Sequence, residues 1–266
     1  MVGMSTASFF PGDTLSAAKS IASLGIKTCE IFFNTYSEYD KKFVTELGRI
    51  MKDNGITVNS IHAMTTQFEP QLFSTHENQY NDAFGVFLKV ADAAEILDAK
   101  YYTFHGQAYY KRGALGKRNF ERIADRLCVL TEELSDRKVD LSLENVHWAT
   151  FSDPSFLSEI KKYKELDKLY YTLDIKQAAQ SMYDINEYVR AMGDRISTVH
   201  LCDYIIDGEA IDTCLPGKGE FHFAALYEKI KETGSNPAYI VEVYKGDYKD
   251  INELKSSVEY LNSIIK

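Results

Sequence analysis

The sequence predicts an α/β fold, a single (β/α)8 TIM barrel spanning residues 1–266, from three observations. The chain has 266 residues, and one such barrel typically needs about 250. Short β-rich segments alternate along it with segments whose apolar residues return every three to four positions. Eight such alternations close naturally into a parallel barrel, whereas an open doubly wound sheet usually has fewer strands and a glycine-rich phosphate loop.

Several of the predicted strands are apolar without interruption, which is typical of strands covered on both faces. The predicted strands are Val2–Ser8, Lys27–Phe33, Thr57–Ala63, Lys100–His105, Asp140–Asn145, Tyr170–Asp174, Ser197–Asp203 and Ala238–Val243. The predicted helices are Thr14–Leu24, Glu38–Asp53, Glu77–Leu97, Arg118–Arg137, Pro154–Leu166, Ile185–Met192, Phe221–Glu232 and Ile251–Ile264. Asp13 and Asp153 are expected to cap helix N-termini, and Gly25 is expected to end the first helix.

Composition and motifs exclude several classes of partner and cofactor. The net charge is -9 and no dense run of Lys and Arg occurs, so we expect no nucleic-acid partner. No GxGxxG or GxxxxGK[ST] motif is present, so no nucleotide cofactor is expected. The chain shows neither a signal-peptide pattern nor about eighteen consecutive apolar residues, and its four cysteines lack CxxC spacing. These features predict a soluble, cytoplasmic protein with free thiols and no membrane partner.

Polar residues gather where the predicted strands end. In barrels of this kind the reacting groups lie at the C-terminal ends of the strands, because the loops there are free to vary. Strand two contributes Glu30 slightly before its end. The later strands end in His62, His105, Glu144, Asp174, His200 and Glu242.

Three of these residues, Glu144, Asp174 and Glu242, follow directly on apolar strand residues and should point into the barrel. A buried carboxylate is costly unless it meets a cation, and their own strand ends offer no Lys or Arg. One divalent metal ion is the simplest countercharge, with His200 as a neutral nitrogen ligand. Taken singly, each residue could be an ordinary core residue, but four at one rim favour a metal site. Three oxygens and one nitrogen favour Mn²⁺, with Mg²⁺, Co²⁺ or Zn²⁺ possible.

Five segments, in this order, match a known pattern: Leu141–Asn145, Leu173–Ala178, Val199–Asp203, Pro216–Gly219 and Ile240–Glu242. The chain resembles the xylose isomerase-like barrel superfamily over nearly its whole length. It is most similar to the sugar phosphate isomerase/epimerase group, which includes ketose 3-epimerases, hydroxypyruvate isomerases, inosose-handling enzymes and, further off, endonuclease IV.

The resemblance implies that Glu144, Asp174, His200 and Glu242 form the group's single metal site. It also implies that the rim histidines His62 and His105 lie near the substrate, and that Pro216–Gly219 is the turn after strand seven. One position departs from the pattern: three residues after the metal-binding aspartate, ketose epimerases commonly have a histidine, and this chain has Gln177. Endonuclease IV-like enzymes need that histidine and an Asp-x-His before the glycine turn, where this chain has Asp212-Thr213-Cys214, so a trinuclear phosphodiesterase is disfavoured.

These features predict a metal-dependent isomerase or epimerase of a small ketose or related polyol ketone, working through an enediolate. Glu144 and Glu242 are the predicted catalytic pair, removing a proton from one face of the substrate and returning one to the other. Return to the neighbouring carbon by the same carboxylate would give isomerisation. An inosose-type dehydratase or lyase and a non-catalytic sugar-binding barrel are the alternatives. The resemblance leaves a homo-oligomer open.

The residues expected to contact the substrate are His62, His105, Gln177, Trp148 and Lys218. Trp148 would form a wall together with Phe9 or Tyr109, although core packing of these aromatic rings is an equal alternative. Cations in the predicted rim loops could receive a phosphate, but such residues are usually only solvated. They are Lys176, Lys218, Lys111 and Arg112.

Overall fold

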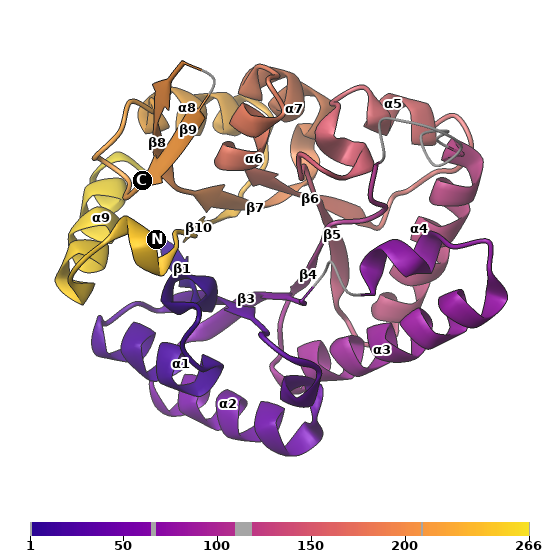
Figure 1. The fold of residues 1–266 in the computed structure, drawn as a ribbon, viewed down its shortest axis with the longest axis horizontal. Helices are drawn as coiled ribbons and strands as arrows, with labels where there is room; N and C mark the ends of the chain where they lie inside the picture. The colour runs from indigo at the N-terminus through magenta and orange to yellow at the C-terminus, as the bar shows by residue number, and fades with distance from the viewer. Residues whose placement is uncertain (1, 65–67, 110–118, 209, 266) are drawn as a thin grey trace.

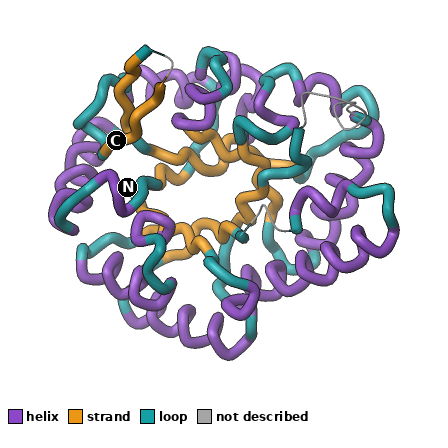
Figure 2. The backbone as a smooth tube through the Cα atoms, viewed as in Figure 1, coloured by secondary structure: helices purple, strands orange, loops and turns teal. Residues whose placement is uncertain are grey.

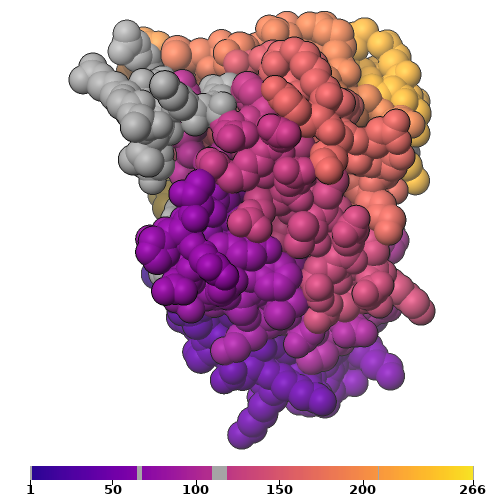
Figure 3. Space-filling model, turned by 90° about the vertical axis from the view of Figure 1, so that its right-hand side faces the viewer, coloured from indigo at the N-terminus to yellow at the C-terminus, as the bar shows by residue number. Residues whose placement is uncertain are grey.

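The computed structural model describes residues 2–64, 68–109, 119–208 and 210–265, and it confirms the predicted TIM barrel. In these residues eight parallel strands close in the order β1-β10-β7-β6-β5-β4-β3-β2. Helices surround the strands (Figures 1 and 2). The N-terminal half of the chain lies in the lower part of the molecule and the C-terminal half in the upper part (Figures 1 and 3).

All eight predicted strands are present, although most are one to three residues shorter than predicted. The barrel strands are β1 (Gly3–Ser5), β2 (Thr28–Phe32), β3 (Thr57–His62), β4 (Tyr101–Phe104), β5 (Asp140–Glu144), β6 (Leu169–Asp174), β7 (Ile196–Leu201) and β10 (Ala238–Val241). The first predicted strand is shortened most, because the chain turns at Thr6 into the 3-10 helix η1 (Thr6–Phe9).

The predicted helices also form; Ile185–Met192 and Ile251–Ile264 keep the predicted bounds, and the other helices have altered ends. They are α1 (Thr14–Ser23), α2 (Lys41–Asp53), α3 (Glu77–Ile96), α4 (Phe120–Ser135), α5 (Phe156–Ile160), α7 (Ile185–Met192), α8 (Phe223–Glu232) and α9 (Ile251–Ile264). Each buries an apolar stripe; in α2 the buried residues include Val44, Leu47 and Ile50. The predicted start of the fourth helix at Arg118 lies outside the described residues.

Two of the three predicted helix boundaries are confirmed. Asp13 caps α1, and Gly25, with φ of +76°, follows the last residues of that helix. The predicted cap at Asp153 is wrong, because α5 begins later and Ser155 is its N-cap. Asp153 Oδ1 instead accepts hydrogen bonds from the backbone N–H and the hydroxyl of Ser155, at 2.9 and 2.7 Å, and so stabilises the preceding turn.

Besides short 3-10 helices, the described residues contain one α-helix and two strands that were not predicted. A six-residue helix, α6 (Ile175–Gln180), follows β6 directly. After β7, the strands β8 (Asp203–Asp207) and β9 (Ala210–Cys214) form an antiparallel hairpin outside the barrel. Asp203 therefore begins this hairpin and does not end strand seven as predicted.

The Asp203 carboxylate anchors the glycine turn that follows this hairpin. It accepts hydrogen bonds from the backbone N–H groups of Tyr204, Gly217, Gly219 and Phe221 at 2.9–3.0 Å. A Cβ atom at Gly219 would lie 2.4 Å from Asp203 Oδ1, so this close approach requires glycine.

The base of the barrel is filled by small hydroxyl side chains. Ser142 Oγ lies 2.7 Å from Thr172 Oγ1 and 2.6 Å from Ser197 Oγ. The large aromatic residues lie instead between the strands and helices, where Tyr102 and Tyr171 are fully buried. These tyrosine rings therefore serve packing, and the barrel interior around Ser142, Thr172 and Ser197 is polar.

Two further sequence expectations can be compared with the structure. All four cysteines are free, as expected. In the described residues, no helix is both long and apolar enough to cross a membrane.

We expect Asp203→Ala to lower the free energy of unfolding by about 2–4 kcal/mol, because four backbone donors lose a charged acceptor. Urea denaturation would measure the change. Asp207→Ala is the matched control, since Asp207 is exposed on the same hairpin and should change stability by no more than about 0.5 kcal/mol. Equal losses in the two variants would contradict the anchoring role.

Asp13→Ala should cost about 1 kcal/mol at neutral pH, because the Asp13 carboxylate accepts a 2.9 Å hydrogen bond from the N–H of Ser16. Hydrogen bonds from Ser16 lower the pKa of Asp13 below its usual 3.8. A lowered carboxylate pKa stabilises the fold above the unfolded value, and this contribution is lost as the pH falls. The difference between the two proteins should therefore shrink in denaturation curves below about pH 3.8 and not grow.

Candidate active site

The four predicted metal ligands meet at the C-terminal end of the barrel. Glu144, Asp174, His200 and Glu242 are all buried, and one ligand atom from each lies within 4.8 Å of the others. His200 Nδ1 is 2.7 Å from Glu242 Oε2, 3.1 Å from Glu144 Oε1 and 3.6 Å from Asp174 Oδ2. The structure thus brings together side chains from four neighbouring strands, as the sequence indicated.

Local hydrogen bonds hold the segments that carry Glu144 and Asp174 in place. Asn145, which follows Glu144, accepts a 2.7 Å bond from the N–H of Asp174 and donates a 3.0 Å bond to the Asp174 carbonyl. Asp174 Oδ1 accepts the N–H of Gln177 at 2.8 Å and so caps α6. Its other oxygen, Oδ2, faces His200. One aspartate therefore begins a helix and offers a ligand atom.

The cluster fits a divalent cation. Glu144 Oε2 and Glu242 Oε2 are buried beside histidine nitrogens, which lie 2.9 Å from the first (His105 Nε2) and 2.7 Å from the second (His200 Nδ1). Buried carboxylates in this state need a cation. Metal–ligand bonds of about 2.0–2.2 Å place neighbouring ligand atoms roughly 3 Å apart or slightly more. The distances of 2.7–3.6 Å around His200 Nδ1 agree with this spacing.

Glu30 lies at the centre of the site, although the sequence analysis did not include it among the site residues. Its carboxylate accepts hydrogen bonds from Ser60 and Thr103, both 2.8 Å, and lies 3.1 Å from His200 Nε2 and 3.3 Å from His62 Nδ1. Burial raises the pKa of Glu30, but His200 and His62 lower it further, so it stays well below the usual value. An ionised Glu30 holds the proton of His200 on Nε2 and leaves Nδ1 for a ligand role.

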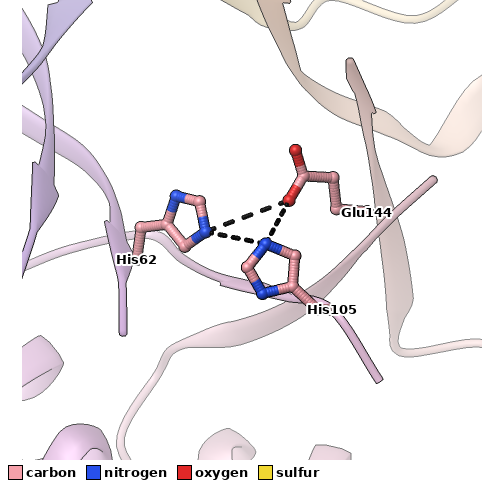
Figure 4. A group of neighbouring side chains, drawn as sticks. All are labelled: His62, His105 and Glu144. Carbon is pink, nitrogen blue, oxygen red and sulfur yellow. Dashed lines mark hydrogen bonds and ion pairs between the residues drawn. The ribbon is translucent and has the colours of Figure 1, made fainter. Parts of the chain in front are cut away.

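The two rim histidines face each other beside Glu144 (Figure 4). His62 Nε2 lies 3.1 Å from His105 Nε2, which is 2.9 Å from Glu144 Oε2. Burial lowers the pKa of His105, but Glu144 and Glu69 outweigh it and raise the pKa to about 10. Phe32 packs edge-on against His62, and Trp148 packs at a tilt against His105.

Glu69 is a second residue that the sequence analysis missed. It lies in the 3-10 helix η4 (Glu69–Phe73), fully buried. It accepts hydrogen bonds from the Tyr102 hydroxyl at 2.8 Å and from the N–H of His105 at 2.9 Å. Its Oε2 is 3.5 Å from His105 Nδ1.

A cavity of about 260 Å³ opens above these residues. Among the predicted substrate contacts, His62, His105, Trp148 and Gln177 line it. The cavity is also lined by Ala7, Phe10, Phe32, Met64, Glu144, Asp174, Lys176, Glu242 and Tyr244. Gln177 is already engaged, since its Oε1 lies 2.6 Å from His147 Nδ1 and 3.1 Å from His147 N.

The cationic residues predicted to lie in rim loops are found in different places. Lys218 is exposed in a separate surface depression with Glu253 and Tyr260, so the structure does not bring it to the cavity. Lys176 is not in a loop but in α6, where it is buried with Nζ 3.1 Å from the Tyr244 hydroxyl. Lys111 and Arg112 lie outside the described residues.

The predicted aromatic wall is only partly present. Phe10 lines the cavity in place of Phe9, which packs partly buried against the core. Tyr109 donates a 2.8 Å backbone hydrogen bond to the carbonyl of Trp148.

The sequence profile of the xylose isomerase-like TIM barrel family matches residues 18–264. The chain belongs to this family. No curated protein sequence matches it significantly.

Among solved structures, the D-psicose 3-epimerase of Clostridium cellulolyticum H10 with D-tagatose is 15% identical, with a TM-score of 0.77 and 99% of both chains covered. A D-tagatose 3-epimerase-like protein is 21% identical, with a TM-score of 0.78 over 100% of this chain and 99% of the other. An L-ribulose 3-epimerase is 14% identical, with a TM-score of 0.77 over 99% and 92%. At these identities the likeness shows the fold alone.

We expect the metal-free protein to be stabilised by added Mn²⁺. At 100 times the dissociation constant the gain is about 2.7 kcal/mol, which corresponds to a rise in Tm of roughly 5–10 °C for a chain of this size. Differential scanning fluorimetry after chelation would measure it. Asp174→Asn should reduce the shift strongly, whereas Asp207→Asn on the exposed hairpin should leave it intact. The same shift in all three proteins would argue against this site.

Proposed function

We propose that the protein is a divalent-metal-dependent isomerase or epimerase of a small ketose or related polyol ketone. The observation that carries the proposal is that Glu144 and Glu242, two buried carboxylates of the candidate metal-ligand cluster, line one cavity. One such carboxylate can remove the proton next to a carbonyl, and a second can return a proton to the other face. The names of the similar solved structures, epimerases of psicose, tagatose and ribulose, support the same class.

The metal would be held by Glu144, Asp174, His200 and Glu242. Mn²⁺ is favoured by this donor set, with Mg²⁺, Co²⁺ or Zn²⁺ as alternatives. When bound, it would supply electrostatic stabilisation for negative charge that develops on the carbonyl and neighbouring hydroxyl oxygens of the substrate.

Glu144 Oε2 and a carboxylate oxygen of Glu242 would exchange protons with the substrate. One accepts the proton from the hydroxyl-bearing carbon next to the carbonyl, and the electron pair of the C–H bond passes into the enediolate. The other delivers a proton to the opposite face of that carbon and inverts the centre, which is epimerisation. Delivery by the first carboxylate to the adjacent carbon produces an aldose, which is isomerisation.

The remaining cavity residues would orient the sugar. His62, His105 and Gln177 can hydrogen-bond to hydroxyl groups, and Trp148 with Phe10 offers an apolar wall. These side chains also exclude water from the space above the carboxylates, which strengthens every electrostatic interaction there. The substrate contact of Lys218 stays a prediction from the sequence. In the structure Lys218 lies in a separate surface depression, away from this cavity.

We expect Glu144→Gln and Glu242→Gln each to lower turnover about 10²–10⁴-fold, because each removes one proton-transfer group. Incubation of free and phosphorylated ketoses and inososes in D2O with Mn²⁺, followed by proton NMR, would report exchange of the carbon-bound proton. Glu228→Gln, an exposed change on α8, is the matched control and should exchange at the wild-type rate.

Several outcomes of that experiment would overturn the proposal. Absence of exchange with every ketose would contradict it. Loss of one water from an inosose by mass spectrometry would assign the protein to the dehydratase class. Unchanged turnover in Glu144→Gln would exclude the proposed proton transfer.

A further inference from the structure

One wall of the cavity is made of hydrogen-bond donor groups. It consists of Lys176 and Gln177, which are consecutive residues of α6, and of Tyr244, which follows β10; we call these three side chains the donor wall. Lys176 comes two residues after Asp174, a proposed metal ligand. Tyr244 comes two residues after Glu242, which is another. The donor wall therefore adjoins the candidate ion site.

Lys176 places a buried positive charge in the donor wall. Its side chain is 6% exposed, and in the part of the chain that the structure describes Nζ forms a 3.1 Å hydrogen bond with the Tyr244 hydroxyl but no ion pair. Asp174 and Glu242 attract the ammonium from further away. An ion held by these two carboxylates would take up their charge and leave the ammonium without a counterion. A buried charge in that state is costly, so an anion from outside the chain would stabilise it.

The Tyr244 hydroxyl is a donor toward the cavity. A lysine ammonium can only donate, so the Tyr244 oxygen accepts the bond from Lys176 Nζ and its own hydrogen points elsewhere. The ammonium also lies over the tyrosine ring, with Nζ 4.6 Å from the ring centroid, and this contact holds the two side chains together. Among the described residues, no acceptor is bound to this O–H group or to the remaining N–H groups of Lys176.

Gln177 also faces the cavity as a donor. The backbone N–H of His147 can only donate, and the atom that it faces at 3.1 Å is Gln177 Oε1, which fixes the orientation of the amide. His147 Nδ1 lies 2.6 Å from the same oxygen, so that oxygen is occupied twice. The amide nitrogen is therefore the group that Gln177 offers to a ligand.

We propose that the donor wall binds an anionic group of the substrate, a carboxylate or a phosphate, so that the substrate is an acidic ketose. Hydrogen bonds to an ionised group are roughly twice as strong as bonds between neutral groups. A neutral sugar hydroxyl both donates and accepts, and its hydrogen would have no acceptor in the donor wall. The inference rests on the function proposed above for the ketose skeleton, and on the donor wall for the charged group.

Three ketoses that differ at their terminal carbon test this inference. D-Fructose, D-fructose 6-phosphate and D-fructuronate carry a hydroxyl, a phosphate and a carboxylate there. Calorimetric titration of the Mn²⁺-loaded protein measures the affinity for each. At least one charged ketose should bind about 10–100-fold more tightly than D-fructose. Tight binding of one charged ketose identifies the anion, and tight binding of both indicates a site that accepts either.

Two variants separate the donor wall from other sources of anion binding. Lys176→Met keeps the length of the side chain and removes its charge, so the preference for the charged ketose should fall at least about 10-fold. Gln177→Glu keeps an oxygen for the bonds from His147 and replaces the amide donor by a carboxylate oxygen, so the preference should fall as strongly. Lys161→Met, an exposed change after α5, is the matched control and should keep the wild-type preference.

The inference would be overturned if the wild type bound the two charged ketoses no more tightly than D-fructose. A preference that persists in both Lys176→Met and Gln177→Glu would overturn it as well. Binding is measured apart from turnover, so the two proposals fail separately. Equal binding together with proton exchange in D2O would contradict the donor wall alone, and a charged-ketose preference without exchange would contradict the reaction alone. Absence of binding by all three ketoses would contradict both.

Discussion

Buried negative charge is the constraint around which this barrel is organised. Glu30 lies deepest, where the hydroxyls of Ser5, Ser60 and Thr103 donate to its carboxylate. An apolar barrel interior of the usual kind could not solvate this residue. The hydroxyl layers below it, such as Ser142 and Thr172, therefore belong to the same adaptation as the metal-binding rim. Histidines connect the carboxylates, since His200 and His62 both face Glu30.

The sequence predicts the cluster of four candidate metal ligands, because the pattern of each strand and the parallel topology point to the same rim of the barrel. Glu144, Asp174, His200 and Glu242 each end an apolar strand, and parallel strands bring such ends to one rim. Glu30 has the same apolar neighbours but lies earlier in its strand, and only the three-dimensional register shows that it reaches the centre. Glu69 gives no local signal, since it comes from an irregular segment and is placed by contacts with Tyr102 and His105.

Other differences between sequence and structure have similar physical causes. Helix α6 is too short for an apolar period to be visible, so Lys176 was expected in a loop and is instead buried. The β8–β9 hairpin begins only one residue after β7, so its first strand is read as a continuation of that barrel strand, although Asp207-Gly208 is typical of a hairpin turn. Lys218 was expected at the mouth, but the turn that carries it is fixed by Asp203 and lies against Tyr260 of α9.

Asp174 both caps helix α6 and offers an oxygen to the candidate metal site, so helix position and metal binding are linked. Because one of its oxygens begins α6 and the other faces His200, the helix cannot shift without moving a prospective metal ligand. Lys176 and Gln177 are carried on that helix and form part of the cavity wall. Divergence toward a different sugar is therefore constrained on this side of the cavity, and the wall at Phe10, which follows β1, is where new specificity can arise without cost to ion binding.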